Sequence, residues 1–206
     1  HPEAPGRIEA IHKKLTESGV AEKCQPLDLR EVADDEDLLV HTDTYLKTVK
    51  TEIDGKSSGT LSTGDTNFGP RSLAIASQAT GSLLNAVDAV MKDELDNAFC
   101  AVRPPGHHAT PTTGMGFCIF NNAAIAARYA QKIHGAERVA NNGWDVHHGN
   151  GTQDVFFEDG SVFFFSTHQH PWYPGTGHPH ETGKGKGKNT TLNAPLPAGS
   201  GIQEIG

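Results

Sequence analysis

The chain of 206 residues is long enough for one α/β domain with a buried core. Its formal net charge of −8 argues against a general nucleic-acid binder, which needs a basic surface. No apolar run reaches the length of a membrane span, and no signal peptide is recognisable. Three cysteines without a CxxC pair are typical of a reducing compartment, so we expect a cytoplasmic protein with neither nucleic acid nor membrane as a partner.

The first half of the chain predicts mainly helices. Residues 7–18 and 42–51 carry apolar residues at helical spacing, and residues 72–92 predict a longer apolar helix of the kind usually buried against a sheet. The acidic residues 34–37 predict a solvated turn. Residues 55–70 are rich in Gly, Ser and Thr and predict a loop.

The second half alternates between strands and a helix. Residues 97–102 predict a short buried strand, residues 117–130 begin irregularly and become a helix, and strands are expected at 138–146 and 161–166. Residues 184–188 alternate Gly and Lys and predict a flexible solvated loop. This order predicts a three-layer α/β fold with a central, mostly parallel sheet and helices on both faces. Ligands bind such sheets at the carboxyl ends of the strands.

Two tandem histidine pairs stand where strands are expected to end. In Asp145-Val146-His147 the first and third side chains project to one side of a strand, and a carboxylate with an imidazole suits Zn²⁺. His107 and His108 follow Arg-Pro-Pro-Gly, in which the prolines predict a rigid turn. Two imidazoles held there suit a general base and its electrostatic partner.

The motifs together resemble the arginase-like deacetylase family, which contains histone deacetylases, bacterial histone-deacetylase-like amidohydrolases and acetylpolyamine amidohydrolases. The Arg-Pro-Pro-Gly form is more similar to the class II and bacterial branch than to class I. The resemblance covers nearly the whole chain, and five motifs carry it in the expected order: Arg103–His108, Gly114–Asn122, Trp144–Thr152, Ser166–His168 and Tyr173–Gly177.

The resemblance implies a zinc-dependent hydrolase that removes acetyl groups from lysine side chains. Asp145 and His147 would be two of three protein ligands to Zn²⁺. His108 would be the general base for the attacking water and His107 its electrostatic partner, and Asn150 would support His108.

The resemblance also implies a substrate tunnel and a second cation. Phe117 and Tyr173 would line a narrow tunnel for the acyl-lysine chain, and Gly116 would let the substrate amide approach the backbone. Asp65 would lie at the rim and accept backbone N–H groups of the substrate. Ser166 would contribute to a structural site for a monovalent cation, K⁺.

The sequence departs from the family pattern in two places. The family has an aspartate where this chain has Gly143, and that carboxylate would hold the His107 imidazole. The family's third zinc ligand, an aspartate, and its transition-state tyrosine belong to later segments than those present here. We therefore expect residues 1–206 to be a single deacetylase domain, incomplete at both ends and truncated at its C-terminus.

Two alternatives to a lysine deacetylase remain open from sequence. The same motifs serve acetylpolyamine amidohydrolases, so the partner is either an acetylated lysine peptide or protein, or an acetylated polyamine. Gly143 and the missing later segments also fit a catalytically impaired domain that binds acyl-lysine or a protein. The sequence does not predict the oligomeric state.

Overall fold

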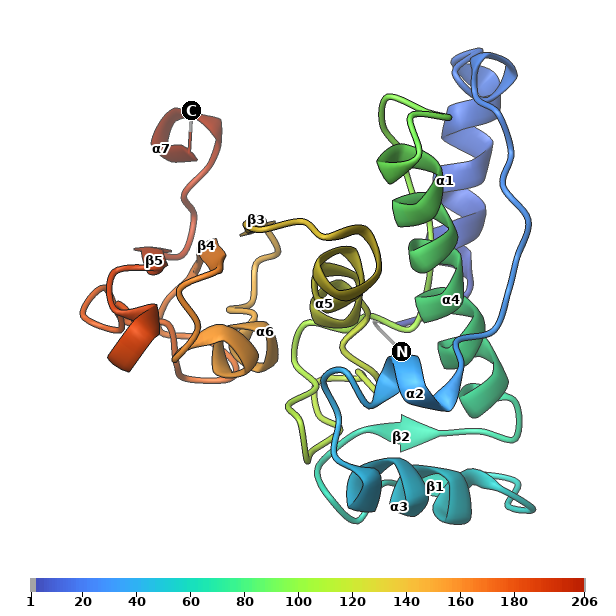
Figure 1. Cartoon of the computed structure of the whole chain (residues 1–206), viewed down its shortest axis with the longest axis horizontal. Coiled ribbons are helices and arrows are strands. Elements are labelled where there is room, and N and C mark those ends of the chain that lie inside the picture. The colour runs from blue at the N-terminus through green and yellow to red at the C-terminus, as the bar shows by residue number, and fades with distance from the viewer. Residues whose placement is uncertain (1–2, 206) are drawn as a thin grey trace.

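Helices dominate the first 134 residues, and a small parallel sheet lies in the C-terminal part of the chain (Figure 1). The computed structural model describes residues 3–205. Its helices are α1 (Gly6–Glu17), α2 (Asp34–Asp37), α3 (Asp43–Ile53), α4 (Ser72–Met91), α5 (Asn122–His134), α6 (Asn150–Phe156) and α7 (Ile202–Ile205), with short 3₁₀ turns η1 (Ala21–Lys23) and η2 (Gly185–Gly187). Its strands are β1 (Gly59–Thr60), β2 (Asn67–Phe68), β3 (Val139–Gly143), β4 (Val162–Gln169) and β5 (Thr191–Leu196).

The four longest predicted helices are confirmed, and their ends follow local chemistry. The side chain of Thr42 caps α3 by accepting the N–H of Tyr45 at 3.2 Å. Asn121 caps α5 in the same way, accepting the N–H of Ala124 at 3.1 Å. Gly135 ends α5 in the left-handed conformation, with φ of 70°, which glycine adopts without strain.

The hydrophobic core lies where α3, α4 and α5 meet. It includes Tyr45 and Val49 of α3, Leu84 of α4 and Ile125 of α5, and it extends to Phe156 at the end of α6. The main neighbour of α4 is α5, so the predicted burial of α4 against a sheet is replaced by packing against a helix. Within residues 3–205 none of the helices combines the length and apolar character that crossing a membrane requires.

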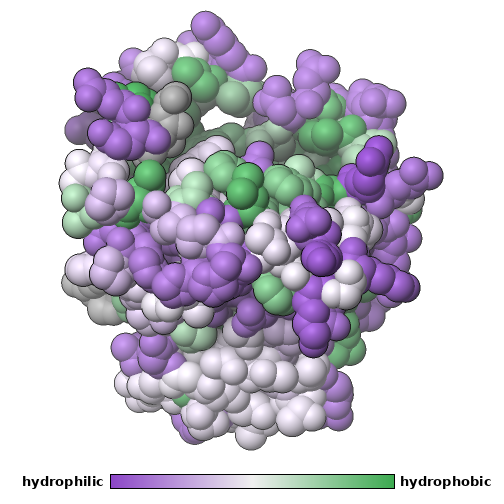
Figure 2. Space-filling view, turned by 90° about the vertical axis from the view of Figure 1, so that its left-hand side faces the viewer, coloured by the Kyte–Doolittle hydropathy of each residue, from purple (hydrophilic) through white to green (hydrophobic). Residues whose placement is uncertain are grey.

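The strands β3, β4 and β5 form a parallel sheet in that order, which confirms the α/β class. Helix α5 contacts β3 and helix α6 contacts β4. Along β4 the side chains alternate, with Val162 and Phe164 buried and Phe163 exposed. Figure 2 shows the side of the molecule where these C-terminal elements lie, and hydrophobic surface forms a band there between more hydrophilic regions.

One predicted strand is wrong. Residues 97–102 are irregular, and the side chain of Phe99 is 70% exposed. A strand needs a neighbour that takes its backbone hydrogen bonds, and no strand of the described chain lies beside this segment. The β-type residues alone therefore do not make a strand here.

Three smaller predictions also need correction. Residues 34–37 form α2 rather than a solvated turn, and Asp37 is buried. The loop at 55–70 contains the short antiparallel pair β1–β2. Residues 184–188 contain η2 rather than an unstructured loop, because Gly187 is buried against the backbone of Phe157 and a Cβ there would lie 2.5 Å from the Phe157 oxygen.

Candidate metal and catalytic site

The tandem pair His107–His108 is held in place by tight backbone packing. The two rings lie with centroids 4.0 Å apart. A Cβ at Gly106 would lie 2.3 Å from the Asn122 side chain, and a Cβ at Gly151 would lie 2.2 Å from the Ala109 oxygen. Only glycine fits at these two positions, so the turn is fixed between α5 and α6.

Asp145 and His147 lie in a bend after β3 rather than on the strand predicted for residues 138–146, and their side chains contact each other there. Asp145 Oδ1 lies 3.1 Å from His147 Nδ1 and also accepts the main-chain N–H of His147 at 2.8 Å. Burial opposes ionisation of Asp145, but the His147 N–H and the nearby histidines outweigh it and lower the pKa of the carboxyl. An ionised carboxylate and an imidazole nitrogen about 3 Å apart suit two ligands of one Zn²⁺, each of which lies about 2 Å from the metal.

These two residues alone do not complete a zinc site. No group of three His, Cys, Asp or Glu side chains arranged to hold a metal occurs within residues 3–205. Catalytic zinc usually has three protein ligands. The donor set therefore fits zinc in chemistry and spacing and supplies two of the expected ligands.

His108 is placed to accept a proton. Its side chain is buried, and its Nδ1 donates to Asn150 Oδ1 at 2.8 Å, as expected for a supporting partner. Asn150 is itself oriented, because its amide nitrogen faces the His108 oxygen at 3.5 Å. Burial lowers the pKa of His108, so the ring is neutral near pH 7 with the lone pair on Nε2.

His107 has a weaker set of partners. Burial and the neighbouring His108 lower its pKa to about 4. Its nearest carboxylate is that of Asp145, with His107 Nε2 and Asp145 Oδ1 4.0 Å apart, beyond hydrogen-bond distance. A Cβ added at Gly143 would meet only Phe165 O at 3.7 Å and Ser166 Oγ at 3.8 Å, which are ordinary contacts. The backbone at Gly143 therefore has room for a side chain that this sequence lacks.

Asp65, Gly116 and Tyr173 come together beside these histidines. Asp65 accepts the N–H of Gly116 at 2.8 Å and the hydroxyl of Tyr173 at 3.1 Å. The Tyr173 ring lies 5.0 Å from the His108 ring, edge to face. A Cβ at Gly116 would lie 2.3 Å from His108 Cδ2, so the glycine is needed for the close approach of His108. The approach of a substrate amide to Gly116 stays a prediction. The Asp65 carboxylate thus links Gly116 to Tyr173, and its predicted place at the rim of a substrate tunnel stays a prediction.

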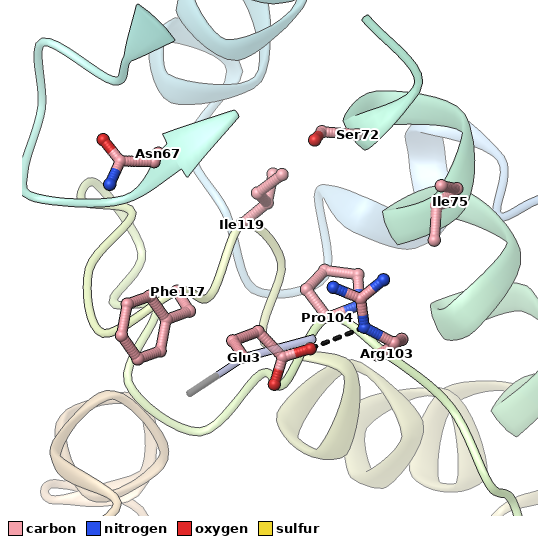
Figure 3. A pocket seen from close by; sticks show the side chains of 8 residues that line it. All are labelled: Glu3, Asn67, Ser72, Ile75, Arg103, Pro104, Phe117 and Ile119. Atoms are coloured by element: carbon pink, nitrogen blue, oxygen red, sulfur yellow. Dashed lines mark hydrogen bonds and ion pairs between the residues drawn. The ribbon is translucent and has the colours of Figure 1, made fainter. Parts of the chain in front are cut away.

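Phe117, predicted as the second tunnel residue, lies beside a separate small cavity. Figure 3 shows its ring at the edge of this cavity of about 130 Å³, together with Ile119 and Pro104. The cavity also contains the ion pair of Arg103 with Glu3, whose atoms are 2.6 Å apart. Phe117 has φ of 68°, and its side chain is 36% exposed, so it faces solvent as well as the cavity.

Ser166 is buried on β4 next to Gly143 in the sheet, where its hydroxyl donates to His168 Nδ1 at 3.0 Å. His168 Nε2 in turn donates to the Gly177 oxygen at 3.0 Å. The structure places Ser166 near the site, and its role in binding a monovalent cation stays a prediction.

Sequence reasoning missed a polar network behind the site. His148 accepts from Thr176 at 2.7 Å and donates to Gln153 at 3.0 Å, and Gln153 donates to Glu181 at 2.7 Å. Burial and the neighbouring His168 lower the pKa of His148 to about 4, so it is neutral. The only signal in the sequence was the second histidine of the tandem pair, since the network joins residues far apart in the chain.

Trp172 was also missed as a site residue. Its indole N–H donates to His147 Nε2 at 3.1 Å. Because Nε2 accepts this bond, the proton of a neutral His147 ring lies on Nδ1, where it faces Asp145 Oδ1. Ligation of a metal through Nδ1 would require this proton and the indole contact to be lost. The segment 171–177 therefore touches the site through both Trp172 and Tyr173.

Known proteins resemble this chain over almost its whole length. The histone deacetylase domain family matches residues 1–205. A probable deacetylase of Archaeoglobus fulgidus is 42% identical over 203 residues, which are 98% of this chain and 55% of that protein. The polyamine deacetylase HDAC10 of Danio rerio is 37% identical over 202 residues, covering 95% of this chain and 30% of that protein. The crystal structure of the HDA15 HD domain has a TM-score of 0.92 and 38% identity, covering 97% of this chain and 57% of that one.

Proposed function

Because this chain belongs to the histone deacetylase domain family, we propose that it provides the water-activating part of a zinc-dependent amidohydrolase that removes acetyl groups from lysine side chains. The chain spans 55% of the archaeal relative and 57% of the solved domain, so the activity proposed is that of the whole protein. The observation that carries the proposal is the convergence of His107, His108, Asp145, His147 and Tyr173 in one site.

The chain's own residues would act as follows. His108, neutral and oriented by Asn150, takes a proton from the water that attacks the acetyl carbonyl. It then returns the proton to the leaving amine, so that acetate and a free amine result. His107 stabilises the positive charge that His108 carries between these two steps. Tyr173 borders the acyl chain beside His108.

Asp145 and His147 would hold the zinc ion. When bound, zinc lowers the pKa of water and polarises a carbonyl oxygen. The close spacing of the Asp145 and His147 donor atoms supports this assignment. The third ligand and the tyrosine that the family resemblance implies would come from segments outside this chain.

The proposal is tested by measuring acetate release from an acetyl-lysyl peptide. The protein should carry this chain together with the later family segments, and the assay is run with and without a zinc chelator. Release that stops with the chelator and returns with Zn²⁺ is expected. Folded, zinc-loaded protein that releases nothing would contradict the proposal. It would favour a domain that binds acyl-lysine without hydrolysing it, as expected if Gly143 lacks the carboxylate that His107 needs.

A polyamine substrate is the second candidate, because one relative is named a polyamine deacetylase. The acidic net charge of −8 suits a polycation, although it also suits ordinary proteins. Comparing kcat/KM for acetylspermidine and an acetyl-lysyl peptide separates the two. A clear preference for acetylspermidine would overturn the assignment to lysine.

A further inference from the structure

The segment 171–177 carries Tyr173 to the proposed site, but it has little apolar packing of its own. Of its residues only Gly177 is buried. Tyr173 makes two contacts at the site, with its ring 5.0 Å from the His108 ring and its hydroxyl 3.1 Å from Asp65. A loop with so few buried contacts is held in one conformation mainly by its hydrogen bonds. The position of Tyr173 therefore depends on how this segment is attached to the rest of the chain.

Gly177, at the end of the segment, is attached through both of its main-chain polar groups. Its oxygen accepts the Nε2 hydrogen of the buried His168 at 3.0 Å, and its N–H donates to Glu181 at 3.2 Å. Its φ is 89°, and an added Cβ would lie 2.4 Å from His168 Nε2 and 2.7 Å from His148 Cγ. Only glycine fits there. The main chain therefore leaves the segment at a fixed position against two buried imidazoles.

Thr176 provides the side-chain attachment that lies closest to Tyr173 in the chain. Its hydroxyl oxygen lies 2.7 Å from His148 Nδ1. The other ring nitrogen, His148 Nε2, lies 3.0 Å from Gln153 Oε1, which can only accept. Nε2 therefore carries the ring proton, and Nδ1 accepts from the Thr176 hydroxyl. Because His148 is only 1% exposed, loss of this hydroxyl would leave Nδ1 shielded from water without its donor.

The Glu181 carboxylate fixes the orientation of the groups behind Thr176. Gln153 Nε2 donates to Glu181 Oε2 at 2.7 Å, so the Gln153 oxygen faces His148. Burial opposes ionisation of Glu181, but the hydrogen bonds from Gln153 and from two main-chain N–H groups outweigh it and lower the pKa of the carboxyl. The negative charge of Glu181 thus holds Gln153, and Gln153 holds the His148 ring with its accepting nitrogen toward Thr176.

A tight turn joins Thr176 to Tyr173. The N–H of Gly175 donates to the oxygen of Trp172 at 2.8 Å, which closes the turn over residues 172–175. Tyr173 lies within this turn, and Thr176 follows it directly. A shift of residue 176 would therefore move the turn and the Tyr173 ring with it.

We propose that Thr176, through the bond of its hydroxyl to His148, is a positioning residue that sets where Tyr173 lies and hence how tightly the acyl chain of the substrate is bound. This inference rests on the proposed function, in which Tyr173 borders that chain beside His108. Thr176 itself does not contact the reacting atoms, so its effect should fall on substrate binding more than on the chemical step.

The matched pair Thr176→Val and Thr176→Ser tests this role in the protein that carries the later family segments. Valine keeps the shape of threonine without the hydroxyl, whereas serine keeps the hydroxyl. With an acetyl-lysyl peptide, Thr176→Val should raise KM by about three- to tenfold and leave kcat within about twofold, the range expected for one hydrogen bond. Thr176→Ser should keep the wild-type KM. Thr51→Val, at an exposed position of α3, is the control.

Amide hydrogen exchange in residues 171–177 tests the attachment without turnover. Thr176→Val should speed exchange in this segment, and Thr176→Ser should not. If no folded variant hydrolyses the peptide, the proposed function fails, and the exchange comparison still decides whether the hydroxyl of Thr176 holds the segment. Unchanged exchange or unchanged KM in Thr176→Val overturns the inference, even if its melting temperature falls. A Thr176→Ser protein as impaired as Thr176→Val overturns it as well.

Discussion

His107 and His108 are adjacent in sequence and in contact, yet their surroundings differ. His108 donates to Asn150 at 2.8 Å, and Asn150 is oriented in turn by the backbone. His107 Nε2 lies 4.0 Å from Asp145 Oδ1, and the position expected to supply a closer carboxylate is Gly143. Two imidazoles on one rigid turn are thus supported to different degrees. The turn that fixes where both rings lie therefore does not ensure that each ring has a partner for its charge.

The largest effect should come from the proposed metal ligands Asp145 and His147, which lie beside His107 and His108. His147→Ala removes one of two donors, so turnover should fall to background, because the metal supplies several kcal/mol of stabilisation at the transition state. Zinc content by atomic absorption should fall in parallel. His134→Ala, at the end of α5, is the control. A His147→Ala protein with unchanged turnover would exclude this residue as a ligand.

Replacing each histidine separately should separate their roles. His108→Ala should lower kcat by about 10²- to 10⁴-fold, because the proposed general base is lost. His107→Ala should lower it by about 10- to 100-fold, since it removes only support for the charge on His108. Steady-state kinetics with one acetyl-lysyl peptide measures both. Equal losses would mean that the two rings act as one unit.

Adding a carboxylate at position 143 should give His107 a partner for its ring, as His108 already has in Asn150. Gly143→Asp places a charge where a Cβ meets no close contact, and it should raise the pKa of His107, which lies at about 4. We expect turnover to rise by roughly three- to tenfold, the equivalent of about 1 kcal/mol. NMR titration of the histidine resonances measures the pKa. Gly143→Asn is the uncharged control, and equal activity of the two variants would show that charge is not what His107 lacks.

Outside the site, Asp37 shows how a buried ionisable side chain without a partner affects the stability of the fold. It is buried with an unpaired Oδ1, and burial raises its pKa to about 7. The folded state therefore prefers the neutral form, and its stability falls as pH rises from the ordinary pKa of Asp to about 7. Asp37→Asn should raise the free energy of unfolding by roughly 1–4 kcal/mol at pH 8 and by much less at pH 4.

Urea denaturation at the two pH values measures the effect of Asp37→Asn. The exposed neighbour Asp35 provides the control, since Asp35→Asn should change little at either pH. A stabilisation of Asp37→Asn that is the same at both pH values would show that ionisation of Asp37 is not its cause.

The parts of the molecule that sequence predicted well are those set by local pattern. Helical spacing located α3 and α4, and the tandem histidine motifs located a site whose members do converge. Short-range chemistry was enough in these cases, because a cap, a glycine or a run of apolar residues acts within one or two turns.

The parts that failed depend on partners distant in the chain. Residues 97–102 have the composition of a strand but no strand beside them in the described chain. The links from His148 through Gln153 to Glu181 cross 33 positions and have no periodic signature. Trp172 reaches His147 from a loop whose path the sequence does not determine. Contacts of this kind are set by tertiary packing, which no local pattern encodes.

The hydrogen bond between Asp65 and Tyr173 joins segments 108 positions apart at the rim of the site. A substrate or inhibitor that contacts both residues would be bound only when the two parts of the chain are docked. By mass action it would stabilise that docking, by about 2.7 kcal/mol at a hundred times its Kd. Binding of such a ligand would then protect the segments around residues 65 and 173 together from proteolysis, so that resistance to a protease becomes a measure of ligand binding.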